Sequence, residues 1–339
     1  MRHLTMNNSI INTFFSELVY QLQSRSSAAV ALESAFLVMI NCLAFAGNTI
    51  VVVAFFRSPS LQTPTNIFIV ALSISDIIMS VFPMPLTAGA VITGAWSYGG
   101  TLCHIQGYLV HVLAFISIEI MALTAINRYC KTLQPSQYSK LFKDSYSAYY
   151  IIVVCAVSCG ILAVTIFPEP SESFVFHPGK LICVRLYSSL AASRVYTAAL
   201  SVMFIVTPAA IIIFCYAKVL LALHRHSTKI QCRYNPRGRG SVRFDTNTNS
   251  SESRQSLVVV RPDIVITRTL VITVICFFVC WVPCFLIDVV DVTIAHALDR
   301  RVYLAYTCLA YMSSACNPLV YGIHNPAFRK GFLNFLKCG

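Results

Sequence analysis

Charged residues are scarce in this chain of 339 amino acids, in which Asp, Glu, Lys and Arg together make up 11%. Soluble globular domains usually carry about 25% charged residues. Disordered segments, coiled coils and collagen-like chains need either more charge or a compositional period, and the sequence has neither. The shortage of charge therefore excludes an ordinary soluble domain and these three classes.

Cysteine patterns that bind zinc are also missing. The chain has 14 cysteines, but none forms a CxxC pair followed by a second pair or by two histidines at metal spacing. Most of them, such as Cys155 and Cys276, lie inside apolar runs, where a thiol usually acts as a small buried hydrophobe. We therefore expect no zinc site.

Apolar residues, in contrast, make up 57% of the chain, and its mean hydropathy is +0.70. They gather in runs that are long enough to cross a bilayer core of about 30 Å as helices and too continuously apolar for barrel strands. The seven runs are 31–56, 66–92, 103–129, 147–168, 194–222, 264–290 and 302–323. The predicted fold is therefore an all-α membrane protein, a seven-transmembrane helix bundle.

Polar segments between and beyond these runs complete the organisation of the chain. Residues 1–30 are expected to form a short amino-terminal tail and residues 31–323 the transmembrane domain. Within that domain, residues 224–262 are expected to be a flexible loop between the fifth and sixth spans. Residues 324–339 are expected to contain a short amphipathic eighth helix on the membrane surface and a short tail.

Basic residues predict the orientation in the membrane. The chain has 25 Lys and Arg, and 18 of them lie on the side that holds residues 224–262 and the carboxyl terminus. The positive-inside rule then places the amino terminus outside and the carboxyl terminus in the cytoplasm, in a multi-pass protein of the plasma membrane. The net charge of +12 reflects this topology and does not indicate a nucleic-acid partner.

This orientation suggests chemistry for residues near the membrane surfaces. Asn7, in an Asn-Asn-Ser segment, is an outer candidate for glycosylation. Cys338 is an inner candidate for palmitoylation, with a plain exposed thiol as the alternative. Cys103 and Cys183 lie at loop depth on the outer side, where a disulfide between them would hold the loop after the fourth span over the mouth of the bundle.

Polar residues inside the spans cost free energy and therefore point to function. Asp76 lies in the middle of the second span, and other polar side chains lie at comparable depth in their own spans. These are Asn48, Ser117, Ser313, Ser314 and Asn317. Together they could hold a monovalent cation, and the alternative is a purely structural hydrogen-bond network.

Two hypotheses apply to the inner ends of the third and sixth spans. Arg128, between Asn127 and Tyr129, ends the third span, and Asp263 opens the sixth. An ion pair between Arg128 and Asp263 would hold the two helices together. In the alternative, Arg128 extends into water and Asp263 only caps its own helix.

Taken in order, these features resemble the rhodopsin-like (class A) G-protein-coupled receptors over essentially the whole chain. The resemblance is carried by Gly47-Asn48, Asp76, Trp96, Cys103 with Cys183, Arg128-Tyr129, Pro208 with Tyr216, Cys280-Trp281-Val282-Pro283, and Asn317-Pro318 to Tyr321. The chain departs from the family pattern at Asn127, where an acid is commoner, and in having no tryptophan in the fourth span.

The resemblance implies roles for several of these residues. Asp76, Ser117 and Asn317 would form a sodium site, with sodium as a modulator and no cofactor required. Trp281 would be the toggle beneath the ligand. The other residues expected to rearrange on activation are Asn127, Arg128, Tyr129, Tyr216, Asp263, Phe277, Asn317, Pro318 and Tyr321.

A ligand pocket is expected in the outer half of the bundle. Counted from Arg128, the position where amine receptors place an aspartate holds Val110. Tyr311 holds the position of the retinal-binding lysine, which excludes a retinal Schiff base. The candidate pocket residues are Val110, His111, Ala114, Tyr187, Trp281, Phe285, Asp288 and Tyr311. In the alternative, His111 is a satisfied interior histidine and Asp288 caps a helix end in water.

Among subfamilies, the sequence is most similar to the melatonin receptors. The similar segments are Ala95–Gly99, Ala125–Cys130 and Val195–Tyr216. Glu169 and Tyr187 stand where melatonin receptors have asparagine and glutamine, and Pro318 stands where they have alanine. Both expected hydrogen-bonding contacts to melatonin are thus changed, which leaves a melatonin-like molecule, a peptide and another non-amine ligand as alternatives.

A signalling receptor, and not an enzyme, is the resulting hypothesis. Its partners would be an extracellular ligand, membrane lipid and a heterotrimeric G protein of the inhibitory class, together with arrestin and a receptor kinase. Candidate phosphorylation sites, or simply solvated linker residues, are Ser241, Ser250, Ser251, Ser253 and Ser256. A secondary transporter would show repeated halves, and an intramembrane hydrolase clustered His, Asp or Ser at helical spacing, and neither pattern is present.

Overall fold

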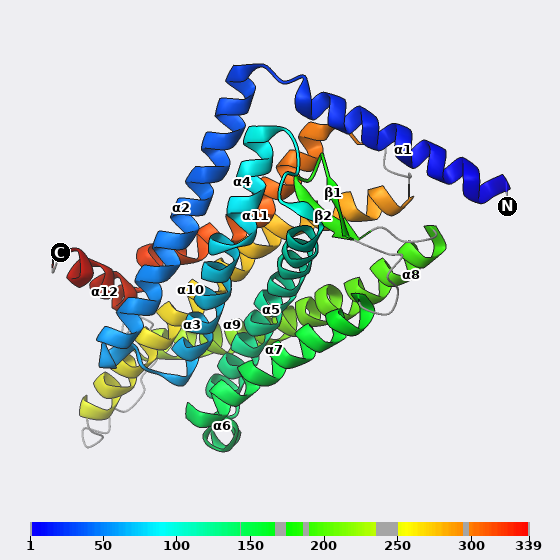
Figure 1. Cartoon of the computed structure of the whole chain (residues 1–339). Helices are drawn as coiled ribbons and strands as arrows, with labels where there is room; N and C mark the ends of the chain where they lie inside the picture. Colours follow the sequence, from blue (N-terminus) through cyan, green and yellow to red (C-terminus); the bar gives the residue numbers. More distant parts are fainter. Residues whose placement is uncertain are drawn as a thin grey trace.

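Long α-helices account for most of the chain in the computed structural model, which describes residues 2–142, 144–166, 174–185, 190–234, 250–293 and 298–337 (Figure 1). The helices are α1 (Arg2–Gln23), α2 (Ser27–Arg57), α3 (Pro64–Val81), α4 (Pro83–Thr93), α5 (Gly99–Leu133), α6 (Pro135–Leu141), α7 (Asp144–Ile166), α8 (Leu190–Ser201), α9 (Thr207–Tyr234), α10 (Ser250–Thr293), α11 (Arg300–His324) and α12 (Pro326–Lys337). The strands are β1 (Phe174–His177) and β2 (Ile182–Arg185). A 3-10 turn at Pro59–Leu61 and a π-helical turn at Val202–Val206 link neighbouring helices.

Six helical segments of the described chain are long and apolar enough to cross a membrane. They are Ser27–Arg57, Pro64–Thr93, Gly99–Leu133, Tyr146–Ala163, Ala191–Arg225 and Ile264–Asp291. Helix α11 packs against α2 and α10 as the seventh member of the bundle. It is less apolar because it starts with two arginines and buries polar side chains such as Asn317. The seven-helix bundle predicted from the sequence is confirmed.

Proline divides two of the spans into separate helical segments. Pro83 has no N–H to donate, so α3 ends at Val81 and Pro83 begins α4. In the fifth span, the π-helical turn Val202–Val206 separates α8 from α9 directly before Pro208. Each of these spans is therefore built from two consecutive helical segments.

Strands β1 and β2 form an antiparallel hairpin in which Phe176 lies opposite Cys183. The hairpin and α1 lie at the same end of the bundle, which we call the hairpin end (Figure 1). At the opposite end, the α12 end, α12 packs against α2 and α11. Phe328 of α12 is 0% exposed, and its ring centroid lies 5.8 Å from that of Tyr321. The short amphipathic helix thus lies within the segment where the sequence predicts it.

The segment expected to be an amino-terminal tail is largely helical in the structure. Helix α1 runs across the hairpin end (Figure 1), where Leu18 and Leu22 are each 1% exposed. The ring of Phe15 lies 5.1 Å from that of His177 in the hairpin. Because these apolar residues recur at helical spacing, they form one buried face of α1, and the polar residues between them form the other.

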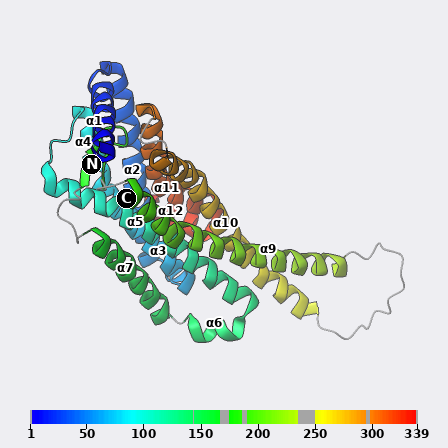
Figure 2. The same ribbon diagram turned by 90° about the vertical axis from the view of Figure 1, so that its right-hand side faces the viewer.

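The polar segment 224–262 also differs from the flexible loop that the sequence predicts. Helix α9 continues to Tyr234, and α10 already begins at Ser250. Both helices project beyond their neighbours (Figure 2), and residues 235–249 between them lie outside the described residues. A helix that is already nucleated in the membrane extends at little cost, so an apolar run marks the part in lipid and underestimates the helix.

Candidate functional site

A cavity around Asp76 lies inside the bundle, and Asp76 itself is 3% exposed. Asn317 donates from Nδ2 to Asp76 Oδ2 at 2.9 Å, and the hydroxyl oxygens of Ser75 and Ser117 lie 3.4 Å apart. The cavity is lined by Ser75, Asp76, Met79, Leu113, Ala114, Ser117, Phe277, Trp281, Ala310, Ser313, Ser314 and Asn317. The structure therefore brings together the three residues of the predicted sodium site, Asp76, Ser117 and Asn317.

The chemistry of this lining fits a monovalent cation. Carboxylate, hydroxyl and amide oxygens are the ligands that hard cations prefer, and the cavity combines all three types. Asn48, which the sequence places at the same depth, instead donates to the backbone carbonyls of Ala44 and Ser314 at 2.8 and 3.0 Å. Asn48 thus joins α2 to α11, and the residues that could hold sodium are those on α3, α5 and α11.

Trp281 closes one wall of the same cavity. Its indole Nε1 donates to Ser313 Oγ at 3.1 Å, which joins α10 to α11. Its ring is stacked on Phe277, with the two centroids 5.8 Å apart. A rotation of Trp281 would therefore break a contact between two helices and change the cavity at the same time.

The predicted switch residues near the α12 end are also buried. Arg128 is 2% exposed, and Asn127 accepts a hydrogen bond at Oδ1 from Thr65 at 2.8 Å. Because Asn127 stands in place of an acid, it joins α5 to α3 by a neutral hydrogen bond. The ring of Tyr129 lies 5.9 Å from that of Phe214.

A second cavity lies between helices that carry the predicted switch tyrosines. Tyr216 on α9 and Tyr321 on α11 both line it, together with Thr273 on α10. Tyr321 is 1% exposed and Tyr216 5% exposed. This cavity therefore lies where α9, α10 and α11 meet beside the two tyrosines.

Most of the predicted ligand residues lie in the half of the bundle nearer the hairpin. Val110 and Tyr311 are 7% and 3% exposed, and Ala114 lines the Asp76 cavity. His111 Nδ1 lies 2.7 Å from the carbonyl oxygen of Gly107, in line with a satisfied interior histidine. Phe285 is half-buried on α10.

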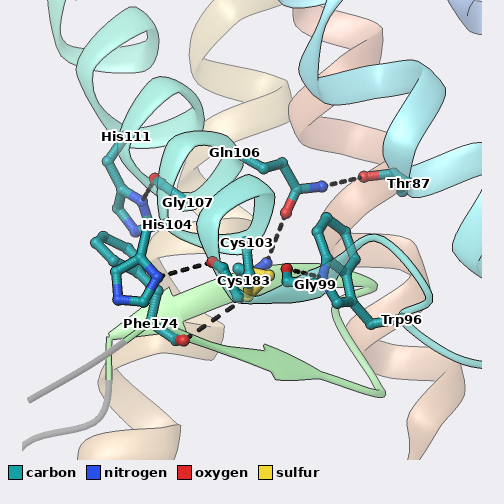
Figure 3. The surroundings of a disulfide bond; sticks show 11 residues. Thr87, Trp96, Gly99, Cys103, His104, Gln106, Gly107, His111, Phe174 and Cys183 are labelled. Carbon is teal, nitrogen blue, oxygen red and sulfur yellow. Dashed lines mark hydrogen bonds between the residues drawn. A yellow bond between two sulfur atoms is a disulfide. The ribbon is translucent and has the colours of Figure 1, made fainter.

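Gln106, which the sequence analysis passed over, connects the hairpin to three helices (Figure 3). Its Oε1 accepts from the backbone N–H of Cys183 at 2.8 Å, and its Nε2 donates to Thr87 Oγ1 at 3.0 Å. Thr87 Oγ1 in turn lies 2.8 Å from the hydroxyl of Tyr311. Gln106 and Thr87 are both 0% exposed. A glutamine inside an apolar run was the signal in the sequence that could have pointed to this network.

The predicted disulfide between Cys103 and Cys183 is present (Figure 3), with a Cα–Cα distance of 5.4 Å. Cys103 lies in the first turns of α5 and Cys183 in β2. Both cysteines pack with Phe174 of β1, and Trp96 lies beside them. The bond and these contacts fix the hairpin over the mouth of the bundle.

Asp288 belongs to a charged cluster that the sequence analysis did not predict. Lys180, in the turn of the hairpin, donates from Nζ to Asp288 Oδ1 at 2.9 Å and lies 2.7 Å from Asp291 Oδ2. Burial lowers the pKa of Lys180, but the charges of the two carboxylates outweigh it and raise the pKa above its ordinary value. Lys180 is therefore held as an ammonium ion, and Asp288 does more than cap a helix.

A second ion cluster at the hairpin end contains Arg25, which follows α1 and donates to the carbonyl oxygen of Leu22 in that helix at 2.6 Å. Glu33 of α2 accepts from Arg25 at 2.6 Å and from Arg300 of α11 at 2.5 Å. Arg25 also donates to the carbonyl oxygen of Val91 at 2.6 Å. These residues hold the amino-terminal helix in place over the bundle.

Several predicted site residues lie outside the described residues, or lie in helices whose side chains are not described there. Tyr187, Glu169, Ser241 and Cys338 lie outside the described residues. For other residues the structure describes the helix and not the surroundings of the side chain: these are Asn7, Ser250, Ser251, Ser253, Ser256 and Asp263. The Arg128–Asp263 ion pair and the modifications of these residues therefore stay predictions.

Comparison with known proteins decides the family. Residues 47–321 match the model of the 7 transmembrane receptor (rhodopsin family). The chain belongs to the rhodopsin family of seven-transmembrane receptors. This is a family of receptors and not of enzymes. The two internal cavities described above are therefore features of a receptor core.

Individual relatives extend this finding along the whole chain. The rhodopsin-family receptor is 26% identical over 322 residues to melatonin receptor type 1B-B of Danio rerio, covering 92% of this chain and 84% of the relative. It is 27% identical over 322 residues to melatonin receptor type 1C of Gallus gallus, covering 92% and 83%. Squid rhodopsin has the same fold, with a TM-score of 0.79, 21% identity, and coverage of 93% and 87%.

Replacing Gln106 with leucine in this receptor is expected to lower the free energy of unfolding by about 2–4 kcal/mol. The substitution leaves the buried N–H of Cys183 without Gln106 as its acceptor, at about 1–3 kcal/mol, and removes one of the two partners of the Thr87 hydroxyl, at about 1 kcal/mol more. Thermal unfolding of the purified receptor in nanodiscs measures the loss. Gln62→Leu, at an exposed glutamine, is the control, and equal midpoints for the two variants would show that the network adds no stability.

Proposed function

We propose that this receptor binds a small molecule at the hairpin end and activates a heterotrimeric G protein at the α12 end. The observation that carries the proposal is the pair of internal cavities lined by α5, α10 and α11, one beside Trp281 and one beside Tyr321. Space at these positions allows α10 and α11 to adopt a second packing. A ligand shifts the receptor toward the second packing only if the ligand binds the second packing more tightly than the first packing.

Charge and chemistry support an orientation with the hairpin end outside the cell. The excess of Lys and Arg lies on the loops of the α12 end, which the positive-inside rule places in the cytoplasm. The disulfide at the hairpin end suits an oxidising compartment. The basic ends of α9 and α10 would then contact the G protein, and arrestin and a receptor kinase would use the same face.

Similarity to melatonin receptors makes indoles the first ligand class to test and the inhibitory G proteins the first partners. The experiment is a panel of melatonin, related indoles and peptides applied to cells that express the receptor. Recruitment of each G-protein class is the readout. We expect a small molecule to recruit the inhibitory class, and a response to peptides alone would contradict the small-molecule ligand.

Asp76→Asn is expected to abolish a stabilising effect of sodium. Asparagine keeps the shape of the side chain and removes the charge that would attract the cation. Sodium that binds the folded receptor raises its unfolding temperature as the concentration increases. The measurement compares unfolding of the purified receptor in sodium chloride and in N-methylglucamine chloride of equal ionic strength.

Ser80→Ala is the matched control for the sodium experiment. Ser80 lies on the same helix, is 3% exposed and donates to the carbonyl oxygen of Ile77 at 2.8 Å. This variant should keep the sodium effect of the wild-type receptor. A wild-type receptor that unfolds at the same temperature in both salts would refute the sodium site.

Asp263→Ala is expected to raise ligand-free signalling by about fivefold. Loss of an ion pair with Arg128 that contributes about 1 kcal/mol changes the ratio of the two states by about fivefold. G-protein recruitment without ligand, at equal surface expression, is the measurement. Asp299→Ala at the hairpin end is the control, and an unchanged basal signal in Asp263→Ala would refute the ion pair.

A further inference from the structure

Lys180 fills a cage of four side chains at the hairpin end. Asp288 Oδ1 and Asp291 Oδ2 lie 2.9 and 2.7 Å from its ammonium nitrogen. The rings of Tyr303 and Tyr306 face the same nitrogen, with centroids at 5.5 and 4.8 Å. Two carboxylates and two aromatic rings around one nitrogen are the groups that recognise organic ammonium ions.

Hydrogen bonds among the four side chains orient the two carboxylates of the cage. The Tyr303 hydroxyl donates to Asp291 Oδ1 at 2.5 Å, and the Tyr306 hydroxyl donates to Asp288 Oδ2 at 3.2 Å. Each carboxylate is thus oriented by a tyrosine of α11, and its other oxygen is aimed at the ammonium ion. Helices α10 and α11, which supply all four groups, pack closely along their length.

Charge and exposure indicate that the cage accepts a cation from outside. Its two carboxylates face one ammonium ion, which leaves one negative charge in excess. The side chains of Lys180 and Asp291 are 8% and 4% exposed, whereas that of Asp288 is 36% exposed. Solvent therefore reaches the cage on the side of Asp288.

The occupant comes from a turn and not from the bundle. Lys180 lies between β1 and β2, where its carbonyl oxygen accepts from the hydroxyl of Thr307. The four-carbon stem of lysine is flexible, so the ammonium group can leave the cage while the backbone of the turn stays in place. When a ligand's ammonium group replaces that of Lys180, Asp288 and Asp291 each keep an ion pair.

We propose that Asp288, Asp291, Tyr303 and Tyr306 form a recognition site for an organic ammonium group, which the receptor's own Lys180 occupies until an ammonium-bearing ligand replaces it. This inference rests on the proposed function as a receptor for a small molecule and defines the chemical class of that molecule. The counter-ion that is missing at Val110 on α5 is supplied instead by α10. The ligand is then a cation, although the similar receptors of Danio rerio and Gallus gallus are named for melatonin.

Binding of n-propylammonium to the purified receptor in nanodiscs tests the site without G protein. The readout is the increase in unfolding temperature, and neutral propan-1-ol is the matched probe. In Lys180→Ala the cage is open, so half-maximal stabilisation should need at least about tenfold less n-propylammonium than in the wild-type receptor, where Lys180 competes. Lys180→Arg should behave as the wild type, because it keeps a cation in the cage.

A second variant shows where the probe binds. Asp291→Asn, added to Lys180→Ala, should remove the stabilisation. Equal concentration dependence in the wild type and Lys180→Ala, equal effects of propan-1-ol, or stabilisation that survives Asp291→Asn would each overturn the proposal. If Lys180→Ala does not reach the cell surface, growth with n-propylammonium should restore its surface expression, and no restoration also overturns it. A receptor that binds n-propylammonium but recruits no G protein with any ligand of the panel would refute the proposed function alone.

Discussion

Replacing Asp291 with asparagine is expected to lower the free energy of unfolding by about 1.5–3 kcal/mol. The substitution removes one of the two carboxylates that hold Lys180, and the range is that of one charge-assisted hydrogen bond, because Asp288 still faces the ammonium ion. Lys180 is 8% exposed and Asp291 4% exposed, so water cannot readily replace the missing carboxylate. Thermal unfolding of the purified receptor in nanodiscs, with surface expression as a second readout, measures the effect.

The double variant Lys180→Met with Asp291→Asn distinguishes a charge effect from a packing effect. It removes the buried ammonium ion and one of its two carboxylates and leaves only Asp288, whose side chain is 36% exposed, so we expect it to be more stable than Asp291→Asn alone. Asp299→Asn is the control, because asparagine caps a helix as well as aspartate does and Asp299 caps α11 at the same end. If the double variant is no more stable than Asp291→Asn, the charge of Asp291 does not stabilise the buried ammonium ion of Lys180.

Hydropathy was sufficient to predict the seven-helix bundle, because twenty or so apolar residues have few other ways to satisfy their backbone in lipid. It could not predict α1, which buries Leu18 and Leu22 against neighbouring segments and not in lipid. The same holds for the extension of α9 to Tyr234, which depends on an existing helix and not on an apolar run.

The buried polar centre was also predictable, because a charge such as Asp76 inside an apolar run is costly and demands partners. The partners on the same membrane level, Ser117 and Asn317, then follow from their depth in the spans. Lys180 could not be found this way. It is 108 positions from Asp288 in the sequence, and only the hairpin brings it over α10.

Gln106 shows a related limit of sequence reasoning. Its role depends on the backbone N–H of Cys183, a group that every residue except proline carries and that no residue type reveals. The disulfide of the same hairpin was predictable because two cysteines are recognisable by type. The disulfide was therefore predictable from residue type, whereas the contact to a backbone group needed the structure.

Cys103→Ser is expected to lower the free energy of unfolding by about 2–4 kcal/mol, the usual contribution of a native disulfide. The loss follows because the bond attaches β2 to α5 across a sequence separation of 80 residues. Without it, the hydrogen bond from Cys183 to Gln106 and the position of Lys180 in its cage both lose support. Thermal unfolding and surface expression measure the loss, and Cys42→Ser, at an exposed free cysteine, is the control.

The double variant Cys103→Ser with Cys183→Ser makes this prediction specific to the bond. Both single changes remove the same covalent link, so the double variant should lose no more stability than either single one. The Lys180 cage provides an independent readout, because a hairpin that is less firmly attached should leave it more often. Half-maximal stabilisation by n-propylammonium should then need a lower concentration in the double variant than in the wild-type receptor. Additive losses in the single and double variants would instead show that each cysteine contributes through its own packing.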